Sequence, residues 1–179
     1  MRRRRIGPLF ALSLLLVVGA CFEGGETGLQ GPKPKAPDFD LPLLDGSQIR
    51  LDEMRGKIVI LDFWATWCGP CEVQMPVLDT LWRDPERRAA HGDDLMIVGI
   101  SVDTDPPQVV ADWIAERGFQ YPIAIGDQDL AMRYGVLGFP SLVIIDPNGG
   151  IHTQHTGVWS RPEIESVLDQ IRRERPLRS

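Results

Sequence analysis

Residues 58–71 read IVILDFWATWCGPC, and two different patterns meet within this stretch. The first half, from Ile58 to Phe63, is a nearly unbroken run of apolar and β-branched side chains, which is typical of a strand buried in a parallel sheet. The second half contains Cys68 and Cys71 with Gly and Pro between them, and Pro is well suited to the first turn of a helix. The stretch therefore predicts a buried strand that leads directly into a helix, with the cysteines at the helix start.

Strand and helix patterns alternate on both sides of this junction. Leu95 to Ile100 is a second buried-strand run, and the chain between the two runs is long enough for the crossover helix that parallel neighbours require. The other expected elements are a hairpin turning at Asp45-Gly46, a helix ending at Gly118, a strand at 121–125, a helix at 130–134, strands at 142–145 and 151–158, and a helix after the Ser160–Glu163 capping box. This order predicts an α/β domain with a central mixed sheet flanked by helices, an N-terminal β-hairpin and a βα insertion.

The N-terminus has the layout of an export signal. Arg2 to Arg5 precede an apolar run from Leu9 to Val18, which is shorter than the roughly 20 residues that cross a bilayer. Residues 18–21, Val-Gly-Ala-Cys, resemble a bacterial lipobox, in which the Cys receives a lipid and becomes the new N-terminus. We expect a lipoprotein-type signal peptide at 1–20 and lipidation at Cys21. A plain signal peptide and an uncleaved signal anchor are the alternatives, and the export route stays open.

Residues 21–37 are rich in Gly and Pro and contain little that a core could bury. Such composition is typical of a flexible tether. The folded domain is therefore expected to span residues 38–175, held at the membrane by the lipid anchor.

The composition excludes several classes of function. With 19 basic and 25 acidic residues the net charge is −6, which argues against nucleic acid as a partner. Three cysteines are too few for a disulfide scaffold, and a single CxxC pair lacks the second half of a four-cysteine zinc site. We therefore expect no metal site, and we expect the cysteines to carry local chemistry.

The CxxC pair is best interpreted as a redox centre. At a helix N-terminus the macrodipole and the unpaired N–H groups stabilise a thiolate at Cys68 and lower its pKa. Cys71 returns to the same side of the first turn, close enough to form a disulfide with Cys68. A buried inert pair or half of a metal site is the alternative interpretation.

The chain resembles thioredoxin-fold proteins over about residues 36–175, because residues 67–71 are the thioredoxin pentapeptide Trp-Cys-Gly-Pro-Cys. Ala-Pro-Asp-Phe at 36–39, the segment 51–57 and Gly-Phe-Pro-Ser at 138–141 are similar to the membrane-anchored TlpA/ResA-like branch. The resemblance implies an exported, membrane-anchored monomer facing the extracytoplasmic side. Such a protein would reduce disulfides in other proteins, and several members of the branch do so in cytochrome c maturation. A membrane thiol protein would be its electron donor, and it would need no cofactor beyond its own disulfide.

The resemblance also gives Asp62 a role. The position six residues before Cys68 matches the buried acid of thioredoxin, which exchanges protons with the second cysteine. A carboxylate among apolar strand residues has a raised pKa, unless Asp62 lies at an edge and reaches water. Gln74 departs from the branch, which commonly has Glu three residues after the second Cys, so the acid function falls to Asp62.

The resemblance implies a substrate-binding surface of Trp67, Gly69, Pro70, Phe139 and Pro140. Pro140 matches the cis-proline of the family, in a loop that faces the cysteines. The main chain of Phe139 would pair with the substrate backbone there. An ordinary strand-entry proline is the alternative for Pro140.

These expectations favour a dithiol reductase in which Cys68 attacks and Cys71 resolves. A metal chaperone, for copper for example, using the Cys pair and a loop histidine is the alternative from another class, and a disulfide oxidase or isomerase is a third. The peroxiredoxin motif is not met, because Leu61 and Ala65 occupy positions where those enzymes have Pro and Thr.

Overall fold

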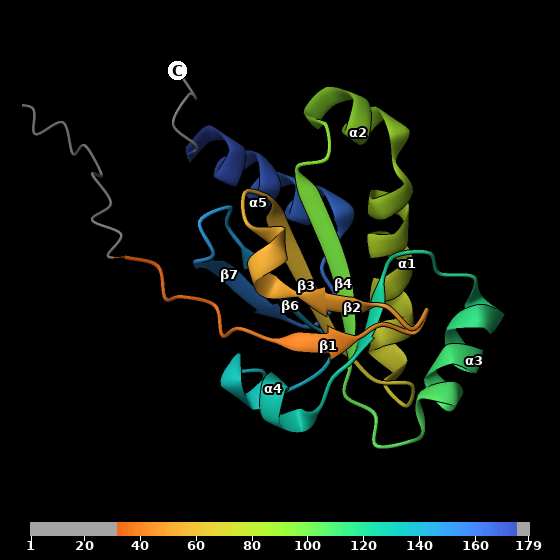
Figure 1. Ribbon diagram of the computed structural model, residues 1–179. Coiled ribbons are helices and arrows are strands. Elements are labelled where there is room, and N and C mark those ends of the chain that lie inside the picture. The colour runs from red at the N-terminus through yellow and green to blue at the C-terminus, as the bar shows by residue number, and fades with distance from the viewer. Residues whose placement is uncertain (1–31, 175–179) are drawn as a thin grey trace, which may run out of the picture. The chain divides into compact units, whose positions relative to one another are not determined.

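A five-stranded sheet with the order β5-β4-β3-β6-β7 forms the centre of the protein (Figure 1). Its strands are β3 (Ile58–Trp64), β4 (Leu95–Ser101), β5 (Ile123–Ile125), β6 (Ser141–Ile145) and β7 (Ile151–Thr156). The computed structural model describes residues 32–174. The expected signal peptide, Cys21 and the expected tether up to Gly31 lie outside the described residues.

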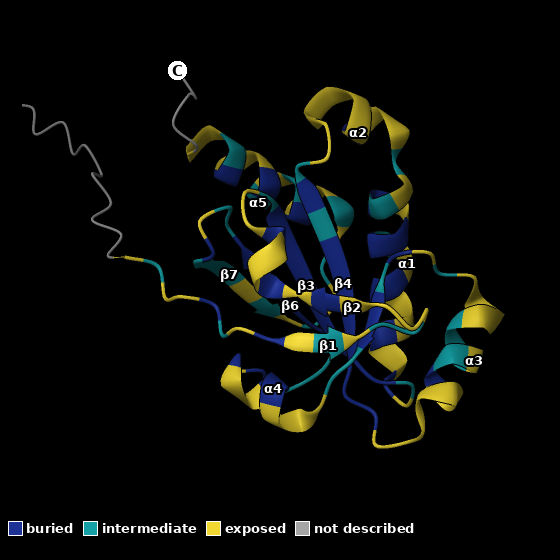
Figure 2. Ribbon diagram, viewed as in Figure 1, coloured by how far each residue is buried: buried dark blue, intermediate teal, exposed yellow. Residues whose placement is uncertain are grey.

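The two buried-strand runs lie side by side as predicted. β3 pairs in parallel with β4, from Ile58 opposite Leu95 to Trp64 opposite Ser101, and pairs antiparallel with β6 on its other edge. Every residue of β3 and β6 is buried, which agrees with sequences that are apolar except for Asp62 and Ser141 (Figure 2). The mixed sheet and the βα insertion expected from the sequence are confirmed.

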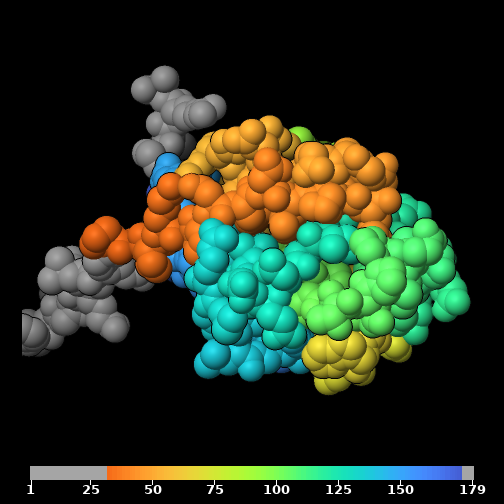
Figure 3. Space-filling model, turned by 60° about the horizontal axis from the view of Figure 1, so that its bottom comes forward, coloured from red at the N-terminus to blue at the C-terminus, as the bar shows by residue number. Residues whose placement is uncertain are grey.

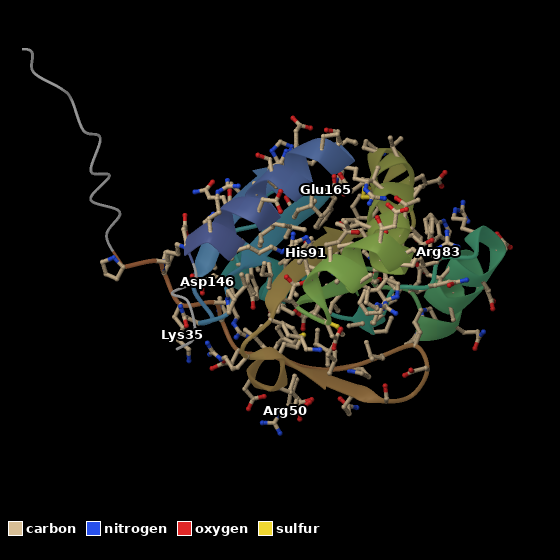
Figure 4. The ribbon with its side chains drawn as sticks, turned by 90° about the horizontal axis from the view of Figure 1, so that it is seen from above. Lys35, Arg50, Arg83, His91, Asp146 and Glu165 are labelled. Atoms are coloured by element: carbon tan, nitrogen blue, oxygen red, sulfur yellow. A yellow bond between two sulfur atoms is a disulfide. The ribbon has the colours of Figure 1, made fainter. Side chains whose placement is uncertain are left out.

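Helices cover both faces of this sheet. Viewed from above, α1 (Gly69–Arg83) and α5 (Arg161–Glu174) lie on one side, and the hairpin of β1 (Asp40–Pro42) and β2 (Gln48–Arg50) lies on the other (Figure 4). Side chains alternate along β3, so Trp64 packs against Trp113 of α3 (Pro107–Arg117), whereas Phe63 packs against Tyr134 at the end of α4 (Gln128–Arg133). A 3₁₀ turn, η1 (Leu51–Met54), joins the hairpin to β3.

One helix, α2 (Pro85–His91), is absent from the expected elements. Its sequence, Pro-Glu-Arg-Arg-Ala-Ala-His, buries only Arg87, so it has no hydrophobic periodicity. The N-terminal cap stabilises this helix. The Asp84 side chain accepts the N–H groups of Glu86 and Arg87, and Pro85 occupies the first turn.

The folded domain begins before residue 38, where the sequence placed its boundary. Lys35 forms an isolated antiparallel bridge with Gly150, and the N–H of the buried Ala36 donates to the carbonyl of Gly149 over 3.0 Å. Figure 4 shows the labelled Lys35 at the same edge of the molecule as Asp146. Residues 33–37 therefore run along the β6–β7 turn, a tertiary pairing that their sequence, Lys-Pro-Lys-Ala-Pro, does not indicate.

Across residues 32–174, no helix combines the length and the apolar character needed to cross a bilayer.

Ala36→Asp is expected to destabilise the full-length protein by at least about 2 kcal/mol, because it buries a charge that has no partner at this position. Lys35→Ser is the matched control, since the Lys35 side chain is 67% exposed, and it should change stability by less than about 0.5 kcal/mol. Denaturant unfolding of the three proteins makes the comparison. If the two variants were equally stable, residues 33–37 would not be part of the folded domain.

Candidate active site

Cys68 and Cys71 are joined in a disulfide where β3 leads into α1. Cys68 is the N-cap residue of α1, and its Sγ accepts the Cys71 N–H over 3.3 Å. Cys68 is 5% exposed and Cys71 is fully buried, so an approaching sulfur can reach only the first of them. The helix N-terminus directs its positive end at Cys68, and this arrangement stabilises a thiolate there once the disulfide is reduced.

An acidic side chain that the sequence analysis did not identify holds the loop before Cys68. Asp103 accepts the Thr66 N–H with both carboxylate oxygens, over 3.1 Å each, and also the Thr66 hydroxyl over 2.6 Å. The Ser101 hydroxyl donates to it over 2.7 Å. Asp103 lies just past the carboxyl end of β4, next to the carboxyl end of its parallel neighbour β3. An acidic residue just past the end of a predicted strand was visible in the sequence. Its contact with the loop before Cys68 follows only from the pairing of β3 with β4.

The loop before β6 lies against the cysteine junction. The Phe139–Pro140 peptide bond is cis, as the resemblance predicted, and the ring centroids of Trp67 and Phe139 are 5.9 Å apart. The Pro140 carbonyl accepts the Gly157 N–H over 2.8 Å, so this loop is tied to the end of β7. Within residues 32–174, neither the N–H nor the C=O of Phe139 has a hydrogen-bond partner. This main chain is therefore available to an incoming polypeptide.

Exposed apolar side chains surround the junction. Trp67 is 64% exposed and Leu137 is 95% exposed, and Val73 of α1 and Val158 after β7 are also exposed. The space-filling view shows the surface near residue 70, in yellow, beside the surface near residue 135, in cyan (Figure 3). We call Trp67, Val73, Leu137 and Val158 the apolar rim. Gly69 and Pro70, which the resemblance assigns to the substrate surface, are exposed as well.

Asp62 is fully buried, which excludes the alternative of a solvated edge carboxylate. Burial raises its pKa from 3.8 to about 7, and the hydrogen bond that the Tyr121 hydroxyl donates to Oδ2 over 3.2 Å partly opposes this rise. The other oxygen, Oδ1, is buried and has no hydrogen-bond partner in the described part of the chain. A carboxyl group with a pKa near neutrality can both accept and release a proton at pH 7.

Gln74 is fully buried and has a structural contact. Its Oε1 accepts the Trp159 N–H over 2.6 Å, which joins α1 to the segment before α5. Its Nε2 has no partner among the described residues. An amide does not titrate, so Gln74 cannot exchange protons with Cys71.

In the chain from residue 32 to 174, no three His, Cys, Asp or Glu side chains are grouped so that they could hold a metal ion. The redox group of the site is the Cys68–Cys71 pair itself.

Comparisons with known proteins agree with this geometry. The AhpC/TSA family pattern matches residues 32–154. The thiol-disulfide oxidoreductase ResA of Geobacillus thermodenitrificans is 36% identical over 139 residues, which cover 76% of each chain. The thioredoxin-like protein YneN of Bacillus subtilis is 33% identical over 147 residues, covering 80% of this chain and 82% of its own.

The fold is also found among solved structures. The exposed lipoprotein thioredoxin Etrx1 of Streptococcus pneumoniae superimposes with a TM-score of 0.62 at 28% identity, covering 75% of this chain and 99% of its own. The described domain therefore has the thioredoxin fold that the CxxC motif and the element order predicted.

Asp62→Asn is expected to remove a pH dependence of stability. The folded pKa of Asp62 is raised, so the native state holds this proton longer than the unfolded chain does. The wild-type free energy of unfolding should therefore fall between about pH 4 and pH 8. At 1.4 kcal/mol for each pKa unit, the fall attributable to Asp62 is about 4 kcal/mol. The Asn variant should lack that fall and be the more stable protein at pH 8.

Denaturant unfolding across this pH range measures the effect as a difference between variant and wild type. Asp38→Asn, which alters an exposed carboxylate, serves as the control and should keep the wild-type slope. Parallel curves for the wild type and Asp62→Asn would mean that the Asp62 carboxyl ionises in the folded protein as easily as in the unfolded chain.

Proposed function

Because the chain belongs to the AhpC/TSA family and is a thiol-disulfide oxidoreductase of the thioredoxin fold, we propose that it acts outside the cytoplasm as a reductase of disulfides in exported proteins. The observation that carries the proposal is the asymmetry of the cysteine pair. Cys68 is the cysteine with exposed surface and accepts an N–H at the helix start, whereas Cys71 is fully buried behind it. This arrangement suits an attacking thiolate followed by a protected resolving thiol.

The reaction begins with the reduced dithiol. The Cys68 thiolate attacks one sulfur of the target disulfide, that S–S bond breaks, and the other target sulfur leaves as a thiolate. Cys71 gives its proton to Asp62 and attacks Cys68 Sγ. A bond forms between Cys68 and Cys71, and the second target thiolate is released. Two electrons have then passed from the protein to the target. A membrane thiol protein supplies two further electrons to the Cys68–Cys71 disulfide and is itself oxidised to a disulfide.

Asp62 is the proton acceptor in this scheme. Gln74 cannot accept a proton, and the pKa of Asp62, about 7, leaves close to half of its carboxyl groups ionised at neutral pH. Asp62 and Cys71 are both fully buried, so the proton transfer occurs away from bulk water.

The substrate is an extended segment of polypeptide next to its disulfide. The unpartnered main chain of Phe139 offers one N–H and one C=O for backbone pairing beside the cis-Pro140 bond. The apolar rim offers exposed side chains for further contacts. Backbone pairing and apolar contacts recognise many sequences, which suits an enzyme whose targets share a disulfide rather than a motif.

Lipidation of Cys21 would hold the domain at the membrane on the extracytoplasmic side, with residues 21–32 as the tether. The lipobox-like sequence supports this placement, and the structural relative from Streptococcus pneumoniae is named an exposed lipoprotein. The TlpA/ResA-like resemblance makes disulfides of cytochrome c precursors one candidate target class.

Cys71→Ser should trap the physiological target, because the resolving attack is lost and Cys68 stays joined to the target. Cells producing this variant should accumulate disulfide-linked adducts that dithiothreitol releases, and mass spectrometry identifies the partner proteins. Cys68→Ser is the control and should form none. Adducts that form on Cys71 instead would reverse the assignment of the two cysteines.

The direction of electron flow is read from cells that produce the wild-type protein, in which the Cys68–Cys71 disulfide can form. After acid quenching and thiol alkylation, a reductase is recovered mainly as the dithiol, whereas recovery mainly as the disulfide would indicate an oxidase.

The mature protein is expected to begin at a lipid-modified Cys21 and to fractionate with membranes. Intact-mass analysis of the purified protein detects the added mass of the lipid, and Cys21→Ser should release the protein from the membrane fraction. An unmodified N-terminus at another residue would rule out the lipid anchor while leaving the disulfide chemistry untouched.

A further inference from the structure

The two oxygens of the Asp62 carboxyl group have different surroundings. Oδ2 accepts the hydroxyl of Tyr121 over 3.2 Å, whereas Oδ1 is buried and has no partner among residues 32–174. A carboxylate fixed through one oxygen has a defined orientation, and its other oxygen is left as the free proton acceptor. Tyr121 is not among the site residues expected from the sequence.

Tyr121 reaches Asp62 because β4 has a glycine at the neighbouring position. Gly99 is the register partner of Asp62 in the parallel pair. A Cβ at residue 99 would lie 3.1 Å from Cε2 of Tyr121 and 2.6 Å from Cδ1 of Ile123. Both distances are shorter than ordinary van der Waals contacts. A side chain at position 99 would therefore move the Ile123 methyl and shift the Tyr121 ring by a few tenths of an ångström.

Contacts on both sides hold the Tyr121 segment in place. The N–H of Gln120 donates to Asp79 Oδ1 of α1 over 2.7 Å, and Arg83 pairs with the same carboxylate over 2.7 Å. The Phe119 ring lies 6.4 Å from the Tyr121 ring, centroid to centroid. The segment belongs to the βα insertion, between α3 and β5, so the insertion delivers a side chain to the active-site region.

We propose that Tyr121 is the positioning residue for Asp62, holding Oδ2 through its hydroxyl so that Oδ1 takes the proton from Cys71. The proposal rests on the proposed function, in which Asp62 is the proton acceptor of the resolving step. When Cys71 attacks, its proton moves to Asp62 Oδ1, the Cys68–Cys71 bond forms, and the target sulfur leaves with the electron pair of the broken bond. Asp62 releases the proton to solvent before the next turnover, and Tyr121 keeps its own proton throughout.

The surroundings of Tyr121 keep its hydroxyl protonated, so that it remains a hydrogen-bond donor to Asp62. Burial raises the pKa of Tyr121 well above 10, and the negative charges of Asp62 and of Asp79 raise it further. Tyr121 therefore stays protonated throughout the working pH range. Tyr121 is the side chain that acts on the Asp62 carboxyl, and Asp62 and Asp79 are the charges that act on Tyr121. The other titratable residues of α1 are Cys71, Glu72 and Arg83, and the register partners of Asp62, Gly99 on β4 and Leu142 on β6, carry no titratable group.

Tyr121→Phe is the direct test, because it removes the hydroxyl and keeps the ring. The lost hydrogen bond favoured the ionised carboxylate, so the titration midpoint of the Asp62 carboxyl carbon, followed by NMR in the oxidised protein, should rise by about one pH unit. From a midpoint of about 7, the ionised fraction at pH 7 then drops to about one tenth. Resolution of a Cys68–glutathione mixed disulfide should slow about fivefold at pH 7, and the ratio to wild type should recover by pH 9.

Tyr134→Phe is the matched control. Its buried hydroxyl donates to the Pro37 carbonyl over 2.6 Å, away from Asp62, so its removal should leave both the midpoint and the pH profile unchanged. Gly99→Ala retains the hydroxyl and shifts the ring by a few tenths of an ångström, so it should raise the midpoint by less than Tyr121→Phe does. If Tyr121→Phe does not fold, the wild-type Tyr121 Cζ resonance supplies the answer: it should shift with the Asp62 midpoint, and a resonance that ignores this titration overturns the proposal.

Asp62→Asn distinguishes a failure of the proton-acceptor role of Asp62 from a failure of the positioning role of Tyr121. It should slow resolution by roughly 10²–10⁴-fold, and adding Tyr121→Phe should then have no further effect on the pH profile. An unchanged rate in Asp62→Asn would refute the proton-acceptor role and with it the proposal. A slowed Asp62→Asn together with an unmoved midpoint in Tyr121→Phe would refute the positioning role alone.

Discussion

The site depends on the parallel pairing of β3 with β4. Because the two strands end side by side, Asp103, just past the end of β4, reaches the loop that precedes Cys68. The same pairing sets Gly99 beside Asp62 and so leaves room for the Tyr121 ring. A slip of one residue in this register would turn Asp62 to the opposite face of the sheet and separate it from Tyr121. The chemistry of the protein is therefore fixed by a backbone alignment several residues away from the cysteines.

The sequence predicted the features that local patterns or the family resemblance specify. The structure confirms the buried strand at Ile58 to Phe63, the helix start at Cys68 and the cis bond before Pro140. The burial of Asp62 also followed from its apolar strand neighbours. In each case the deciding information lies within about ten residues of the feature, or in a motif already attached to the fold.

The remaining features depend on tertiary neighbours, which a single sequence does not show. Tyr121 reaches Asp62 only when the insertion is folded against β4. Asp103 reaches Thr66 only when β3 lies beside β4. Ala36 belongs to a Gly- and Pro-rich segment, and its backbone pairs with Gly149, more than a hundred residues away in the chain. Short polar segments such as α2 carry no periodic signal, so a capping residue and its contacts determine them.

The attachment of residues 33–37 at the β6–β7 turn has a mechanical consequence. Pro140 precedes the first residue of β6 and Asp146 follows its last, so the full five-residue strand separates the catalytic loop from the turn that binds the N-terminal segment. Lys33 adds ion pairs to Asp146 and Glu174 at that far end. A pull on the chain at Pro32 would load these contacts first. Beyond them, it would reach the cis-proline loop along the whole of β6 or through the hydrogen bond that the Tyr134 hydroxyl donates to the Pro37 carbonyl. The contacts that first bear tension on residues 32–36 therefore lie at the end of β6 that is away from the redox centre.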